Sequence, residues 1–277
     1  MRSLLCFVLV AAGVCQAQIV LAHEPRKGVV FEVEDQRETT VKVLLKAKAR
    51  GSGEAKFISS ESKYTEEVLG VGPLTLKRVY ERSLREDRQV SQTDLEPMRS
   101  SQHGRTVLLK DLTKTLEGGG ALDKQDREEL RFERLLAALL PPQRVVERGD
   151  SWEISGSAVA RSLFGDALPT ETTDHSGAVV KLRSIKRKKS GEVAKLEVKG
   201  LRVKIKRTRN VPELTLDLKG LFEWDVVNSA PIKAELSGTV HYVVRVGDRI
   251  SAEANGPYRW RYQAKLVEHD ESAPADD

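Results

Sequence analysis

Cysteine and aromatic residues are scarce in this sequence of 277 residues, which contains two cysteines and 5% Phe, Trp and Tyr. Both cysteines, Cys6 and Cys15, lie near the N-terminus, so the rest of the chain has no disulfide, no thiol nucleophile and no thiolate metal ligand. Stability must therefore come from burial of a core. Because aromatic residues are so few, any place where they gather is informative.

The N-terminus has the features of a signal peptide. One positive charge precedes Leu4–Val14, an apolar run of eleven residues, which is the size of a signal-peptide hydrophobic region and too short to span a bilayer. Small residues favour cleavage after Ala17, with cleavage after Ala22 or a lipid anchor at Cys15 as alternatives. We expect residues 1–17 to be removed and the protein to be exported to the periplasm or the cell exterior, with no transmembrane segment remaining.

Composition divides the exported chain into four segments. We expect residues 18–117 to form a β-rich half and residues 118–142 to combine a glycine linker with a helix. Residues 143–267 should form an antiparallel β-meander, and the acidic residues 268–277 a disordered tail. The triple glycine that starts at Gly118 lacks the Lys-Ser/Thr pair of a phosphate loop, so we interpret it as a flexible linker.

One main helix is predicted between the two halves. Asp123 is a candidate N-cap for a helix over Lys124–Leu140, which is rich in leucine at its end and is stopped by Pro141 and Pro142. A second, short helix is predicted over 157–164. The charged segment Glu81–Arg88 fits either a strand or a helix.

The C-terminal half shows strict alternation of apolar and polar residues. Even-numbered residues are apolar or glycine in Leu214–Val226, Ile232–Val246 and Tyr258–Leu266, which predicts long strands with the even-numbered side chains buried. The parity of the apolar residues changes around Gly200, which predicts a bulge there. Glycines recur in mid-strand at similar spacing, as at Gly238, and predict a sheet that bends at one level.

These patterns together predict an α+β protein that is mostly antiparallel β. We expect a curved meander sheet or half-barrel, made largely by the C-terminal half, with the one main helix packed on it or capping it.

Most of the large aromatic residues of the C-terminal half are predicted on one concave face of this sheet. There they could line a cavity for a hydrophobic ligand or lipid, or they could simply form the core with their polar tips at the rim. The candidate ligand-binding residues are Phe222, Trp224, Tyr242, Tyr258, Trp260 and Tyr262.

The positive charge is concentrated in one segment. The formal net charge is +5, yet residues 181–209 hold thirteen Lys or Arg against two acidic residues. This segment could bind an anionic polysaccharide or lipid headgroups, whereas export argues against nucleic acid. The alternative is a solubilising hairpin with a charged edge that deters strand pairing. The candidate polyanion-binding residues are Lys186, Arg187, Lys188, Lys189, Arg202, Lys204, Lys206, Arg207 and Arg209.

No pattern in the sequence predicts a catalytic centre, a metal site or a cofactor. The five histidines show no metal-ligand spacing, and the acidic residues form no calcium loop. Ser151 follows Gly149 and Asp150 in an order similar to the nucleophile block of GDSL-type hydrolases, but the Asp-x-x-His block of that family is missing. We therefore favour a Gly-Asp turn that leads into a strand anchored by Trp152.

Two resemblances bear on the fold. The V-x-x-G-D-x-W turn at Val146–Trp152, followed by long strands with internal glycines, resembles exported bacterial proteins of unknown function over about Pro141–Leu266. A curved sheet with an intervening helix is also similar to the lipoprotein-carrier fold of periplasmic lipid chaperones. No ligand residue of that family can be matched here, so this second resemblance implies architecture alone.

We therefore expect a non-enzymatic exported binding or scaffold protein that holds a hydrophobic ligand or lipid in its curved sheet. The alternatives are a module that binds polyanions or a cell surface through the basic hairpin, and a serine hydrolase built on Ser151. The sequence predicts neither the ligand nor the oligomeric state.

Overall fold

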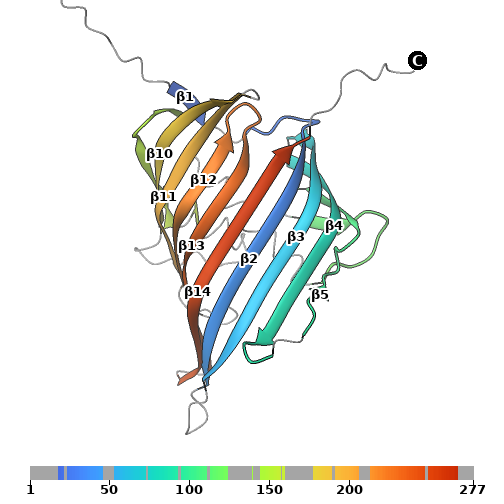
Figure 1. Ribbon diagram of the computed structural model, residues 1–277, viewed down its shortest axis with the longest axis vertical. Helices are drawn as coiled ribbons and strands as arrows, with labels where there is room; N and C mark the ends of the chain where they lie inside the picture. The colour runs from blue at the N-terminus through green and yellow to red at the C-terminus, as the bar shows by residue number, and fades with distance from the viewer. Residues whose placement is uncertain are drawn as a thin grey trace, which may run out of the picture.

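The fold is an antiparallel β-sheet rolled into an open cone (Figure 1). In the described part of the chain, 79% of the residues lie in strands and 2% are helical, so the prediction of an α+β fold was wrong. The predicted antiparallel sheet itself is confirmed. The computed structural model describes residues 18–21, 24–45, 53–72, 74–92, 95–110, 113–123, 139, 144–156, 158–159, 177–188, 191–205, 213–246 and 249–267.

The strands form two sheets. The small sheet pairs β1 (Gln18–Leu21) with β8 (Arg144–Glu147). The large sheet has the order β7-β6-β4-β3-β2-β14-β13-β12-β11-β10-β9, with β5 paired to β4. Its strands are β2 (Val30–Leu45), β3 (Gly53–Val71), β4 (Leu74–Gln89), β5 (Met98–Arg99), β6 (Thr106–Lys110), β7 (Thr113–Leu116), β9 (Ser151–Ser155), β10 (Gly177–Lys188), β11 (Gly191–Ile205), β12 (Glu213–Asp225), β13 (Ala230–Val246) and β14 (Arg249–Leu266).

The two halves of the chain share this large sheet. β2 pairs antiparallel with β14, from Phe31 opposite Leu266 to Leu45 opposite Ala252. The sequence left open whether the N-terminal half forms its own sheet, and this pairing shows that it continues the C-terminal meander. In Figure 1 the sheet is wide at the top, where β14 ends, and narrows toward the bottom.

The predicted helix over Lys124–Leu140 lies outside the described residues except for Leu139, which is in a turn. Of the second predicted helix, Ala158 and Val159 are described and helical. The α+β prediction was wrong because it inferred the fold class from one leucine-rich segment. Charged segments elsewhere in the chain also form strands.

Glu81–Arg88 shows how charged sequence becomes a strand. It lies in β4, where its acidic side chains reach across to lysines of β3. The Nζ atom of Lys63 lies 2.9 Å from the Glu81 carboxylate, and that of Lys56 lies 3.4 Å from Asp87. Cross-strand ion pairs of this kind favour strand pairing, so the segment needs no helix to place its charges.

Burial follows the predicted alternation along most of β12 and β14. Leu216, Leu218, Phe222 and Trp224 are buried in β12, and Trp260, Tyr262 and Ala264 are buried in β14, whereas the odd-numbered side chains between those of β14 are exposed. The pattern reverses toward the narrow end of β13, where Tyr242 is 40% exposed and Val243 only 4%. Side chains on the concave face are thus buried toward the wide end, whereas the side chain of Tyr242 is exposed to solvent.

Mid-strand glycines mark the level at which the sheet coils. The register of β11 against β12 shifts between Val198 and Leu201, which confirms the predicted bulge at Gly200. A Cβ atom on Gly238 would lie 1.9 Å from the carbonyl oxygen of Asp217, and one on Gly256 would lie 1.8 Å from that of Thr40. Only glycine allows neighbouring backbones to approach this closely.

The V-x-x-G-D-x-W turn joins β8 to β9, and the turn is hydrogen-bonded to β10. Gly149 has φ 101°, and its N–H donates to the carbonyl of Leu182 at 2.9 Å. The Asp150 carboxylate accepts from the Glu147 N–H at 3.0 Å, and the Trp152 indole donates to the carbonyl of Leu139 at 3.0 Å. The glycine, aspartate and tryptophan of the motif therefore each have a structural role.

Candidate functional site

The concave face carries most of the aromatic residues singled out in the sequence. Phe222, Trp224, Trp260 and Tyr262 are buried there, and Tyr258 is half-buried beside them. The indole of Trp260 meets the ring of Tyr262 edge-on, with 6.5 Å between the ring centroids. The structure thus gathers these side chains as a dry apolar wall, and the exposed Tyr242 lies outside it.

Aliphatic side chains complete this wall. All of them belong to one buried cluster with the aromatic residues, which spans the large sheet from β7 to β9 and extends to β1 and β8. The aliphatic members in these elements include Ile19, Leu21, Val146, Val180, Leu182, Leu196, Val198, Leu201, Leu216, Leu218 and Leu236.

Charged residues that the sequence analysis missed stand beside this wall on β2. The Trp260 indole Nε1 donates to the Asp35 carboxylate at 2.8 Å, and Arg37 forms an ion pair with the same carboxylate. The guanidinium carbon of Arg37 lies 5.9 Å from the Trp260 ring centroid, within the range of a cation–π contact. The signal was present in the sequence, because both residues occupy inward positions that continue the alternation from Val33.

A second buried polar group lies on β3, β4 and β7. The rings of Tyr64 and Tyr80 are 4.9 Å apart, and the guanidinium carbon of Arg78 lies 4.7 Å from the Tyr64 centroid. The Nζ atom of Lys114 donates to the Gln102 side-chain oxygen at 2.6 Å and lies 5.6 Å from the Tyr80 centroid. In the N-terminal half the interior therefore combines buried polar groups, such as Arg78 paired with Glu66, with apolar residues of the same core, such as Phe31 and Leu109.

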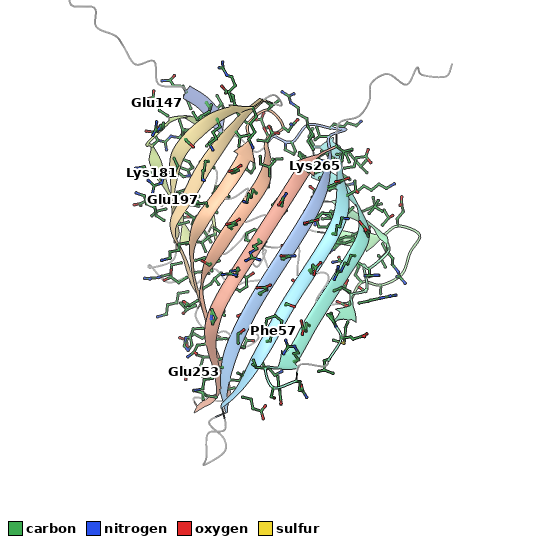
Figure 2. All side chains as sticks on the ribbon, in the orientation of Figure 1. Phe57, Glu147, Lys181, Glu197, Glu253 and Lys265 are labelled. Carbon is green, nitrogen blue, oxygen red and sulfur yellow. The ribbon has the colours of Figure 1, made fainter. Side chains whose placement is uncertain are left out.

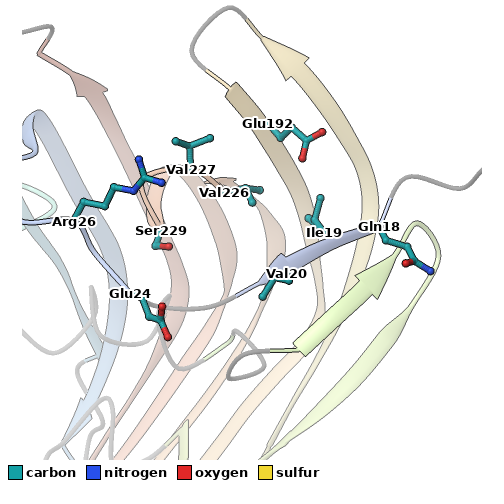
Figure 3. Close-up of a pocket in the computed structure, with 9 residues that line it drawn as sticks. All are labelled: Gln18, Ile19, Val20, Glu24, Arg26, Glu192, Val226, Val227 and Ser229. Atoms are coloured by element: carbon teal, nitrogen blue, oxygen red, sulfur yellow. The ribbon is translucent and has the colours of Figure 1, made fainter.

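A pocket of about 400 Å³ opens at the wide end of the cone (Figure 3). β1 crosses in front of the large sheet there, and the pocket lies between β1 and the turn that joins β12 to β13. It combines apolar side chains with charged ones and includes Ile19, a member of the buried core. Its lining residues are Gln18, Ile19, Val20, Glu24, Arg26, Glu192, Val226, Val227 and Ser229.

Hydrogen bonds fix the sheet side of this pocket. The Asp225 carboxylate accepts from the backbone N–H groups of Val227 at 2.9 Å and Asn228 at 3.0 Å. The Val226 N–H donates to the carbonyl of Glu192 at 3.0 Å, and Ser229 has φ 50°. Hydrogen bonds therefore fix the conformation of this wall of the pocket, whereas the opposite wall belongs to the small sheet.

The two basic groups predicted to form one patch lie at opposite ends of a hairpin. In the β10–β11 register, Lys188 is opposite Gly191 at the turn, whereas Arg202 is opposite Gly177 at the other end. Arg202 also binds the Asp217 carboxylate at 2.6 Å, and Lys204 is exposed beyond it. Lys189, Lys206, Arg207 and Arg209 lie outside the described residues. Lys186, Arg187 and Lys188 are exposed at the turn end.

Two carboxylates on the outer face of the sheet, those of Glu197 and Glu235, are paired with basic side chains. The pKa of the Glu197 carboxyl is lowered because Arg183 donates a hydrogen bond to it at 2.6 Å, and Glu197 stands opposite Lys181 in the sheet (Figure 2). A hydrogen bond from Lys233 likewise lowers the pKa of Glu235. This face is thus a solvated ionic surface, in contrast to the dry concave face.

The hydrolase interpretation finds no base for Ser151 among the described histidines. His103 contacts the backbone of Ser83, and His241 lies 2.8 Å from the Glu253 carboxylate. Trp152, next to Ser151, is buried. His23, His175 and His269 lie outside the described residues. Within the part of the chain that is described, no three His, Cys, Asp or Glu side chains cluster to hold a metal ion.

No helix among the described residues is long and apolar enough to cross a membrane.

Comparison with known proteins identifies no family. No family model and no curated protein matches the sequence. Among solved structures, lipovitellin in a study of lipid–protein interactions is 7% identical over 92% of this chain, with a TM-score of 0.45. A β-barrel-like protein of the domain of unknown function DUF1849 from Brucella abortus is 9% identical over 88% of this chain and 100% of its own, with a TM-score of 0.22. This chain spans 26% of the lipovitellin chain, and at these scores neither likeness extends to function.

Proposed function

We propose that this protein is a non-enzymatic carrier that holds a hydrophobic ligand, such as a lipid, against the concave face of its open cone. The observation that carries the proposal is the pocket at the wide end, where the core residue Ile19 meets solvent-accessible space. Ligand sites are typically concave and mostly apolar, with a few polar groups at fixed positions. The lining of the pocket is more polar than apolar, with Arg26 and Glu192 beside its valines, so the pocket would serve as the entrance and the concave face would supply the apolar contact.

The small sheet contains the strand that would move to admit a ligand. β1 and β8 pair only with each other among the described strands, in four residue pairs, and are not hydrogen-bonded to the large sheet as strands. Their inner side chains Ile19, Leu21 and Val146 cover part of the apolar wall. Two-stranded sheets are marginally stable on their own, and the turn after β8 is hydrogen-bonded to Leu182 of β10, so β1 is the strand that would move.

Exported protein purified from its native host should contain bound lipid. We expect native mass spectrometry to show a mass above that of the mature chain, and organic extraction to remove it. If nothing co-purifies and the purified protein takes up no fluorescent fatty acid, the carrier proposal is wrong.

A variant of the pocket gives a sharper test. In Val227→Trp the indole ring narrows the pocket between β1 and the β12–β13 turn, so we expect fatty-acid uptake to slow by about tenfold, which corresponds to about 1.4 kcal/mol of added barrier. Val79→Trp is the matched control, because Val79 is 46% exposed on β4. Equal uptake rates for both variants would show that the ligand does not enter by this route.

We also propose that the exported chain begins at Gln18. The buried side chains of Ile19 and Leu21 make β1 part of the core, so cleavage after Ala22 would remove a structural strand. Intact-mass measurement of the exported protein should give the mass of residues 18–277. A mass that starts at His23 would contradict the proposal, and a lipid-modified mass that starts at Cys15 would favour the anchored form.

A further inference from the structure

An exposed apolar pair lies on the outside of the small sheet, next to the pocket. Val20 of β1 and Val145 of β8 are register partners and are 52% and 55% exposed. Val20 also lines the pocket, where Val226 and Val227 continue the apolar surface onto the large sheet. The neighbouring pair, Ile19 and Val146, is buried, so the two valines lie on the solvent-facing side of the small sheet at the mouth of the cone.

Basic side chains lie near these valines. Arg144 precedes Val145 and Arg148 lies in the turn after β8, and both are exposed, as is Arg26 at the edge of the pocket. The turn end of the β10–β11 hairpin adds Lys186, Arg187 and Lys188.

The hairpin tip and the pocket belong to the same surface. A Cβ atom on Gly191, which is opposite Lys188, would lie 2.5 Å from the Cγ2 atom of Val227, and the next residue, Glu192, lines the pocket. We call the combined area the rim surface: Val20, Val145, Val226, Val227, Arg26, Arg144, Arg148, Lys186, Arg187 and Lys188.

We propose that the rim surface docks the protein onto a lipid bilayer that carries anionic headgroups. Exposed valines enter the boundary between headgroups and acyl chains, and the surrounding basic side chains bind lipid phosphates. The six basic residues of this surface outnumber the four acidic ones that share it, Glu24, Glu147, Glu192 and Glu223. This charge complementarity selects a lipid surface over a neutral apolar partner.

The basic side chains at the hairpin tip can replace their carboxylate partners with lipid phosphates. Arg187 lies 3.4 Å from Glu192, but its side chain is 86% exposed, and Lys188 lies 3.7 Å from Glu223. Ion pairs this exposed contribute little to stability. Docking in this orientation turns the pocket toward the bilayer, yet it does not require a ligand inside the cone.

Vesicle co-sedimentation with the full exported chain tests the proposal. We expect binding to vesicles of phosphatidylcholine with phosphatidylglycerol and much weaker binding to phosphatidylcholine alone. The triple variant Lys186→Ala, Arg187→Ala, Lys188→Ala should lose about 100-fold in partitioning to the anionic vesicles, because each basic residue near the surface counts for several-fold. Val20→Ser with Val145→Ser should weaken binding to the same vesicles.

Two controls far from the rim surface complete the experiment. Met98→Ser removes an apolar side chain that is 64% exposed on β5, and Arg99→Ala removes an exposed charge next to it, and neither change should alter vesicle binding. Absence of binding by the unmodified protein, or equal losses in the rim and control variants, would overturn the proposal. Loss in the triple variant without loss in the valine variant would also overturn it, since a polyanion site needs no insertion. Lipid co-purification is measured separately, so failure of docking is distinguishable from failure of the carrier function.

Discussion

Gly238→Ala is expected to lower the free energy of unfolding by about 3 kcal/mol, at the upper end of the cost of inserting a methyl group into a packed site. The new Cβ atom would lie 1.9 Å from the Asp217 carbonyl oxygen, 2.9 Å from its carbon and 3.0 Å from the Leu218 Cα atom. All three are backbone atoms of β12, so rotating a side chain cannot relieve the overlap. The pairing of β12 with β13 must therefore loosen at the level where the sheet coils.

Thermal or urea unfolding measures this effect. At about 2–4 °C per kcal/mol for a chain of this size, the melting temperature should fall by roughly 6–12 °C. Gly200→Ala is the matched control, because Gly200 is also a strand glycine but a Cβ atom there would have no atom within 4 Å. Equal losses in both variants would show that strand flexibility, rather than close backbone approach, sets the cost.

Asp35→Ala is expected to cost about 3 kcal/mol as well, because it breaks a buried charged group on the concave face. The carboxylate accepts the Trp260 indole hydrogen bond at 2.8 Å and forms the ion pair with Arg37, and both aspartate and indole are buried. Its loss removes two charge-assisted interactions at once. A change in tryptophan fluorescence should accompany the loss of stability, because Trp260 loses the partner that orients it.

Two further variants separate the contributions. Asp35→Asn keeps an acceptor for Trp260 but removes the charge, so it should cost less than alanine, and the difference reports the indole hydrogen bond. Asp87→Ala, which breaks the exposed pair with Lys56 at 3.4 Å, should cost at most about 0.5 kcal/mol. If Asp35→Ala is as mild as Asp87→Ala, the buried group does not stabilise the cone.

The strands of the C-terminal half could be predicted because one of their faces is buried and the other solvated. The alternation of Leu216, Leu218 and Phe222 with polar residues identifies the buried face. The change of parity near Gly200 identifies the bulge. In the N-terminal half the inward positions of β2 include Asp35 and Arg37, so hydropathy alone loses the period there. The alternation from Val33 marks both positions as inward, but the partner of Asp35 on the neighbouring strand, Trp260, is known only once β2 is paired with β14.

The candidate site depends on contacts that local sequence does not encode. The pocket joins residues 18–26 with the turn at 226–229, and the rim surface adds the tip of another hairpin. The predicted single basic patch is two separate groups in the structure. The register of β10 against β11, which local sequence does not encode, places Lys188 and Arg202 at opposite ends of the hairpin. For the leucine-rich segment before Pro141 the error was to infer the fold class of the whole protein from one local helical pattern.

The pairing of β2 with β14 has a consequence for how the chain folds. The centre of the sheet is closed by β14, the last strand among the described residues, with Arg37 opposite Trp260. Contacts across so long a stretch of chain form slowly, because the entropy of closing the loop is lost before the contact stabilises it. Until β14 has been made and has paired with β2, the buried group that Asp35, Arg37 and Trp260 share cannot form.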